Sequence, residues 1–103
     1  MTPPAARGDG SKRKVLVVED EKDIRDLIRY NLEQEGFAVL EADDGELALA
    51  LIKRERPALV ILDIMLPGMS GLEICRSIRH DDETSAVPIL MLTARAAEVD
   101  KVV

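Results

Sequence analysis

Four polar side chains that share a chemistry stand at the ends of short apolar runs in this sequence. Glu19 and Asp20 follow residues 15–18, Asp63 follows residues 60–62, and Thr93 follows residues 89–92. Short, β-branched runs of this kind are typical of strands that are buried in a parallel sheet. Ligands of open parallel sheets bind beyond the carboxyl ends of the strands, so we expect these four residues to meet at one edge.

Carboxylates that converge in this way repel one another, and a hard divalent cation relieves the repulsion. Mg²⁺ prefers a few carboxylate oxygens together with water. A carboxylate such as that of Asp63 can then attack phosphorus to form an aspartyl phosphate, and the hydroxyl of Thr93 can donate a hydrogen bond to a phosphoryl oxygen. Taken singly, each residue has a structural alternative: Glu19 and Asp20 could begin a helix, Asp63 could be a turn residue, and Thr93 could be an N-cap.

Between the apolar runs the hydrophobic period changes to that of a helix. Gly36 is a plausible stop for the first helix, and Pro57 closes the second. Asp43 with Glu46, and Ser70 with Glu73, match the capping-box spacing at two helix starts. The apolar positions that mark the three helices are Ile24, Leu27, Ile28 and Leu32, then Leu47, Ala48, Leu51 and Ile52, then Leu72, Cys75 and Ile78.

This alternation of strands and helices predicts an α/β fold, a doubly wound parallel sheet with helices on both faces. We expect four strands, with residues 38–40 at an edge, three helices and the start of a fourth after Thr93. The fifth strand and helix of such a sheet have no counterpart in the sequence. Residues 1–13 are interpreted as a flexible leader and residues 14–103 as one domain.

Composition narrows the classes of function. The 103 residues carry a net charge of -6, which argues against direct binding of nucleic acid, because that needs a basic face. Cys75 is the single cysteine, which suits a reducing cytoplasm, and its apolar helical setting favours a small buried side chain over a nucleophile. No stretch approaches the ~20 apolar residues of a membrane span, so we expect a cytoplasmic protein without a membrane contact.

Three stretches resemble the receiver domain of bacterial two-component response regulators. Residues 17–21 are similar to its acidic signature, residues 62–71 to its phosphoacceptor loop, and residues 88–95 to its fourth-strand motif. The similarity runs from about Lys14 to Val103, and its character resembles that of the subfamily that carries a winged-helix DNA-binding domain. It implies a flavodoxin-like fold and a switch that a sensor histidine kinase phosphorylates, with no enzymatic activity beyond Mg²⁺-dependent self-phosphorylation and dephosphorylation.

The resemblance also implies a role for each site residue. Asp63 would be the phosphoacceptor, and Thr93 would bind the phosphoryl group and move on activation. Asp20 would ligate Mg²⁺ directly, Glu19 would do so directly or through water, and the backbone carbonyl of Met65 would complete the protein ligands. Pro67 and Gly68 would shape the loop beside Asp63. Arg95 would tune the lifetime of the phosphate, or equally be a solvated surface residue.

One departure from the family leaves other functions open. The family has a lysine after its fifth strand, and the lysines of this chain are Lys12, Lys14, Lys22, Lys53 and Lys101. None of them follows a strand after Thr93, so the chain could instead be a phosphorylation-incompetent interaction module or a fragment that forms a homodimer. An aspartyl-phosphate hydrolase would need a second acid where Met65 stands. A flavin-binding module would need a phosphate-cradling loop where Glu19, Asp20 and Glu21 stand.

Overall fold

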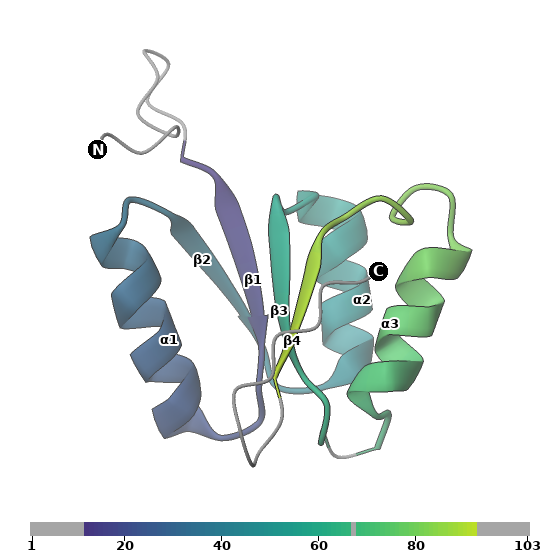
Figure 1. Ribbon diagram of the computed structural model, residues 1–103, viewed down its shortest axis with the longest axis horizontal. Coiled ribbons are helices and arrows are strands. Elements are labelled where there is room, and N and C mark those ends of the chain that lie inside the picture. Colours follow the sequence, from purple (N-terminus) through teal and green to yellow (C-terminus); the bar gives the residue numbers. More distant parts are fainter. Residues whose placement is uncertain (1–11, 67, 93–103) are drawn as a thin grey trace.

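The computed structural model describes residues 12–66 and 68–92, which form a four-stranded parallel sheet with helices on both faces (Figure 1). The elements are β1 (Lys14–Val18), α1 (Lys22–Gln34), β2 (Ala38–Ala42), α2 (Gly45–Glu55), β3 (Leu59–Asp63), α3 (Gly71–His80) and β4 (Ile89–Leu92). The strand order is β2-β1-β3-β4, so the predicted flavodoxin-like α/β sheet is confirmed, with β2 at an edge. The predicted start of a fourth helix and most of the predicted leader lie outside the described residues.

The central strands form because their apolar residues can be buried on both faces at once. Alternate side chains of a strand point to opposite faces. In β1, Leu16 and Val18 belong to the core on one face, and Val15 and Val17 to the core on the other. All four are at most 1% exposed. β1 therefore anchors the sheet, and it pairs in parallel with β2 on one side and with β3 on the other.

The larger core lies between the sheet and the helices α2 and α3, which cover the same face (Figure 1). Ala48 and Ile52 of α2 and Ile74 and Ile78 of α3 are at most 2% exposed. Burial of a large aliphatic side chain stabilises a fold by about 1.5–3 kcal/mol. Packing in the larger core therefore fixes the position of α3. The first residues of α3 follow the loop that leaves β3.

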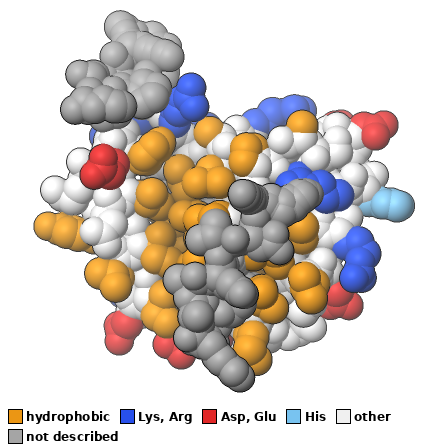
Figure 2. Space-filling view, in the orientation of Figure 1, with side chains coloured by type: hydrophobic (Ala, Val, Ile, Leu, Met, Phe, Trp, Pro, Cys, Tyr) orange, Lys and Arg blue, Asp and Glu red, His pale blue; other side chains and the backbone are white. Residues whose placement is uncertain are grey.

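The smaller core lies on the opposite face, under α1. Ile28 and Leu32 of α1 pack there together with the half-buried Leu90 and Leu92 of β4. Figure 2 shows apolar side chains gathered over the middle of this side of the molecule. Leu27, also on α1, is 62% exposed. α1 lies against β2 and β1, and β4 is at the other edge of the sheet.

The structure corrects two details of the predicted helices. The N-cap of α2 is Asp44, which accepts a hydrogen bond from the Leu47 amide, and not Asp43. Cys75 packs against the larger core and is half-buried, where a small buried side chain was predicted. The capping box of Ser70 and Glu73 at the start of α3 is confirmed.

The helices also differ from the prediction in the faces that they bury. Leu47 and Leu72 are 43% and 53% exposed, although both were assigned to the apolar pattern. In α3, Ile74 is fully buried in the larger core instead, although the predicted pattern did not include it. None of the helices in the described ranges is long and apolar enough to cross a lipid bilayer.

Candidate functional site

Glu19 follows β1 directly, and its main chain and side chain are both held in place. Its amide donates to the carbonyl of Ala42 at the end of β2, at 3.0 Å. Its carboxylate oxygen Oε2 accepts a hydrogen bond from the Glu21 amide, also at 3.0 Å. Glu19 is only 5% exposed, which is unusual for an acid. The carboxylate is therefore held at the carboxyl end of the sheet and does not extend into solvent.

Asp63 is the last residue of β3, and the chain around it is held in a similar way. Its Oδ1 accepts a hydrogen bond from the Met65 amide at 3.0 Å, which fixes the rotation of the carboxylate. The next amide along the chain, that of Ile64, donates to the Leu92 carbonyl at 3.0 Å. Asp63 is half-buried and lies opposite Leu92 in the β3–β4 register. The last residue of β4 thus lies beside Asp63 in the sheet.

The start of α3 approaches Asp63 so closely that only glycine fits at position 71. A Cβ atom on Gly71 would meet the backbone carbonyl oxygen of Asp63, and it would lie 2.6 Å from the Cα of Ile64. The Gly71 amide also donates to the Ile64 carbonyl at 2.8 Å. The loop between β3 and α3 therefore folds back against the strand end, with Gly68 in the left-handed region at a φ of 80°.

Glu19, Asp20 and Asp63 form one cluster at this edge of the sheet. Each offers a carboxylate oxygen, and the three oxygens all lie within 4.8 Å of one another. Two oxygens bound to one Mg²⁺ at 2.0–2.1 Å would lie about 3 Å apart when adjacent and about 4 Å apart when opposite. The donor atoms and their spacing therefore suit a hard divalent cation. Glu19 is buried, Asp63 is half-buried and Asp20 is exposed, so the cluster opens to solvent on the side of Asp20.

The electrostatics of the cluster also favour a cation. Burial, and to a smaller degree the negative charges of Asp63 and Asp20, raise the pKa of Glu19 to about 7, although the hydrogen bond from the Glu21 amide opposes this shift. Near neutral pH the cluster therefore holds a proton on Glu19 in much of the population. A divalent cation placed among the three carboxylates would displace that proton, because it compensates the same negative charge.

Not all residues singled out in the sequence fall within the described part of the chain. Thr93, Arg95 and Pro67 lie outside it. The side chain of Met65 is 66% exposed, and this residue contributes a backbone amide to Asp63. A thioether cannot act as an acid or a base, so the hydrolase alternative finds no second acid at this position.

The residues that support the cluster were not predicted from the sequence. The Glu21 amide and the Ala42 carbonyl both bind Glu19, and Arg25 donates from Nη1 to the Glu19 carbonyl at 2.8 Å. Backbone groups leave no signal in a sequence. Arg25 did leave one, as a basic residue one helical turn after an acidic loop, but spacing alone did not distinguish it from a solvated side chain.

Fold and site together define an open α/β module whose functional edge is built from carboxylates at the ends of β1 and β3. The family model of the response regulator receiver domain matches residues 15–103, and the chain belongs to this family. Receiver domains act in two-component signalling and have histidine kinases as their general partners. The acidic cluster is consistent with the magnesium site of such domains.

Solved structures of receiver domains resemble the chain in both sequence and fold. The N-terminal domain of a response regulator receiver protein from Methanoculleus marisnigri is 39% identical, with a TM-score of 0.77 over 80% of this chain and 67% of that one. The chemotaxis protein CheY4 of Vibrio cholerae is 34% identical, with a TM-score of 0.78 over 84% and 72%. The receiver domain of a histidine kinase from Syntrophus aciditrophicus is 27% identical, with a TM-score of 0.75 over 79% and 61%. Receiver domains of this shape thus occur in different kinds of signalling protein, and the fold does not specify the output.

Proposed function

We propose that this chain is a phosphoacceptor switch in which Asp63 takes a phosphoryl group from a sensor histidine kinase. The observation that supports this most strongly is the carboxylate of Asp63 at a strand end, with oxygens of Glu19 and Asp20 within 4.8 Å. In the transfer, a carboxylate oxygen of Asp63 forms a bond to phosphorus while the bond from phosphorus to the kinase histidine nitrogen breaks. The resulting aspartyl phosphate is the signalling state.

Different residues of the site would bind the metal, orient the nucleophile and contact the phosphoryl group. Glu19 and Asp20, with Asp63 and the Met65 carbonyl, would hold Mg²⁺, which when bound neutralises charge on the transferring group. The Met65 amide keeps Asp63 in one rotation, so the nucleophile does not have to be ordered during the reaction. The exposed side of the cluster at Asp20 is open to the donor. Thr93 would donate a hydrogen bond to a phosphoryl oxygen.

The test of this function is the intact mass of the protein after incubation with acetyl phosphate and Mg²⁺. We expect an increase by one phosphoryl group in the wild type and none in Asp63→Asn. Asp82→Asn, which removes an exposed acid in the turn before β4, is the matched control and should react like the wild type. An unchanged adduct in Asp63→Asn would refute the assignment. Absence of an adduct in the wild type would favour the inert interaction module.

Metal binding can be tested separately. A titration of the wild type with Mg²⁺ should show saturable binding, and Asp20→Asn should weaken it, because the variant removes the charge of the exposed carboxylate. Asp82→Asn again serves as the control. Equal affinities of the wild type and Asp20→Asn would remove Asp20 from the ligand set.

The wider setting of the switch also belongs to this proposal. Residues 14–103 would form one receiver domain after a leader of residues 1–13, in a cytoplasmic protein that regulates transcription through a winged-helix output domain. The resemblance of the stretch from about Lys14 to Val103 to that subfamily supports this setting. Reading the encoding gene past Val103 tests it, because a different output domain or a stop codon there would contradict the subfamily assignment.

A further inference from the structure

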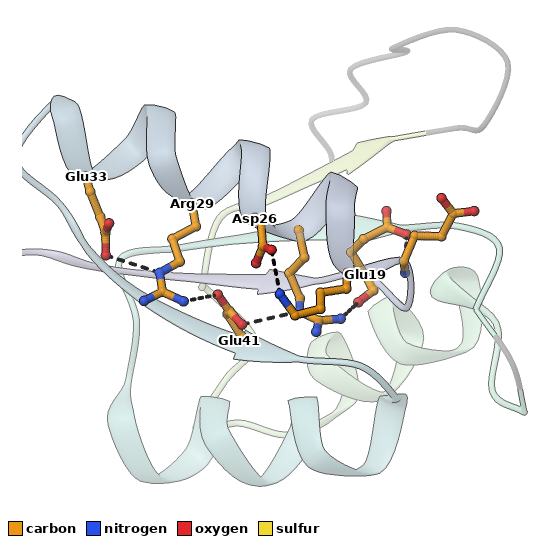
Figure 3. Close-up of polar contacts among 8 residues, drawn as sticks. Glu19, Asp26, Arg29, Glu33 and Glu41 are labelled. Carbon is orange, nitrogen blue, oxygen red and sulfur yellow. Dashed lines mark hydrogen bonds and ion pairs between the residues drawn. The ribbon is translucent and has the colours of Figure 1, made fainter.

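A carboxylate near the end of β2 joins two arginines of α1. Glu41 accepts hydrogen bonds from Arg25 Nε at 3.3 Å and from Arg29 Nη1 at 2.8 Å. Figure 3 shows Glu41 below α1, facing Arg29, with Glu19 further along the same side of the helix. The side chain of Arg25 is 15% exposed and that of Glu41 26%, whereas that of Arg29 is 47% exposed. Arg25 and Glu41 therefore form the better-shielded of the two ion pairs.

Arg25 differs from Arg29 in what its guanidinium contacts at the other end. Its Nη1 donates to the backbone carbonyl of Glu19 at 2.8 Å. The amide of Glu19 donates to the Ala42 carbonyl, and Ala42 follows Glu41 directly. Both backbone polar groups of Glu19 are thus attached to β2, one of them directly and the other through the bridge of Arg25 and Glu41. Glu19 is also the buried member of the carboxylate cluster.

This arrangement suits a site that holds a cation. Arg25 contacts the main chain of Glu19 through a carbonyl, so that hydrogen bond does not occupy a carboxylate oxygen that a cation would need. Glu41 compensates the positive charge of the guanidinium, which lowers its repulsion of a nearby cation. A planar guanidinium can hold both acceptors at once, since its donors point in fixed directions, whereas an ammonium group is a single point of charge.

We propose that Arg25 is a positioning residue for the acidic site, and that Glu41 holds it in place and balances its charge. The Arg25–Glu41 bridge fixes the main chain of Glu19, and through it the geometry of the three carboxylates. This inference rests on the proposed function, because it takes Mg²⁺ binding as the property that the bridge improves. Residues that support metal ligands from outside typically change metal affinity by 10–100-fold when they are removed.

The experiment compares Arg25→Ala with Arg29→Ala as the matched control. Both variants remove an α1 arginine that binds Glu41, but only the first removes the hydrogen bond to the Glu19 carbonyl. We expect Arg25→Ala to weaken Mg²⁺ binding about tenfold or more, and Arg29→Ala to change it by about twofold or less, as is usual for an exposed ion pair. Thermal unfolding of each variant without Mg²⁺ separates a loss of affinity from a loss of stability.

A second readout does not depend on the metal. The Glu21 amide donates to the Glu19 carboxylate, so its hydrogen exchange reports whether that carboxylate stays in place. In metal-free protein, exchange at Glu21 should accelerate in Arg25→Ala relative to exchange at Gly71, whose amide lies in the other loop of the site. It should not accelerate in Arg29→Ala.

Two conservative variants keep the test decisive if Arg25→Ala does not fold. Arg25→Lys keeps the charge but cannot hold both acceptors, and should lose most of the affinity that Arg25→Ala loses. Glu41→Gln keeps an acceptor but leaves the guanidinium charge uncompensated, and should weaken Mg²⁺ binding more at low salt than at high salt. Wild-type affinity in Arg25→Lys and Glu41→Gln, or equal affinities in Arg25→Ala and Arg29→Ala, would overturn the role of Arg25 alone. A wild type that binds no Mg²⁺ would overturn the proposed function, and this inference with it.

Discussion

The raised pKa of Glu19 predicts an unusual dependence of stability on pH. Without a divalent cation, the folded protein holds a proton on Glu19 up to about pH 7, whereas the unfolded chain releases it near the usual value of 4.5. The folded state therefore binds more protons than the unfolded state between these two values. Stability must fall as the pH rises through this window, and it becomes independent of this group above it.

The magnitude follows from the difference between the two values. At 1.36 kcal/mol for each pKa unit, a shift from 4.5 to about 7 corresponds to roughly 3 kcal/mol of stability lost on the way to neutral pH. This is a large part of the ~5–15 kcal/mol that is typical of a small domain. The carboxyl groups whose pKa values are lowered by the hydrogen bonds they accept act in the opposite direction, at more acidic pH; they are Asp26, Glu55 and Asp81.

The assay is urea unfolding of metal-free protein at pH 5 and pH 8, in the wild type and in Glu19→Gln. The amide of glutamine is neutral at both values and retains an oxygen for the Glu21 amide. We expect the wild type to lose most of the roughly 3 kcal/mol between pH 5 and pH 8, and Glu19→Gln to lose much less. Saturating Mg²⁺ should stabilise the wild type more at pH 8 than at pH 5, because the proton competes with the cation. Equal pH dependence in wild type and variant would show that protonation of Glu19 does not contribute to the stability of the folded state.

Three further predictions follow from the packing. Gly71→Ala should destabilise the protein by about 1–3 kcal/mol through contact with the Asp63 backbone, and it should weaken Mg²⁺ binding. Gly68→Ala, at an open position with a φ of 80°, should destabilise it by about 1–2 kcal/mol with little effect on Mg²⁺ binding. Denaturation and Mg²⁺ titration of both variants test this difference. Ser70→Ala should cost about 0.5–2 kcal/mol in urea unfolding through loss of the capping box, and Ser77→Ala, at an exposed position in α3, should be nearly neutral. Among the described strands β4 pairs only with β3, and Leu90 and Leu92 are only partly buried. The 103-residue chain should therefore self-associate in sedimentation experiments. A monomer at all concentrations would contradict this prediction.

Much of the fold was predictable because short unbroken apolar runs, which indicate buried strands, alternate with segments whose apolar residues have helical spacing. Residues 15–18 and 89–92 are short apolar runs without a helical period, and both form strands. β1 is buried on both faces, whereas β4 is buried on one face and half-buried on the other. The convergence of Glu19, Asp20 and Asp63 was predictable for the same reason, since parallel strands carry their carboxyl ends to one edge.

The helix faces were less predictable, because apolar spacing does not say how much of a helix the sheet covers. Leu27 and Leu72 satisfy the spacing and are exposed, whereas Ile74 is buried. The choice of Asp44 over Asp43 as a cap depends on one residue of register, at an end where helix boundaries are least certain from sequence.

The unequal burial of the site acids was not predictable either. Glu19 is buried and Asp20 is exposed, although the two are neighbours in the sequence. The difference arises from the direction in which each side chain leaves the end of β1, and from tertiary partners such as Ala42 and Arg25. These contacts come from β2 and α1, so no local pattern around Glu19 contains them.

Mapping the modified residue is the most direct test of whether Asp63 accepts the phosphoryl group. Protein treated with acetyl phosphate and Mg²⁺ is reduced with borohydride, which converts an aspartyl phosphate to homoserine, and its peptides are sequenced by mass spectrometry. We predict homoserine at position 63 in the reaction with Mg²⁺, and none there when Mg²⁺ is chelated. Reduction at Asp20 or at another acid, with Asp63 unchanged, would show that Asp63 is not the phosphoacceptor.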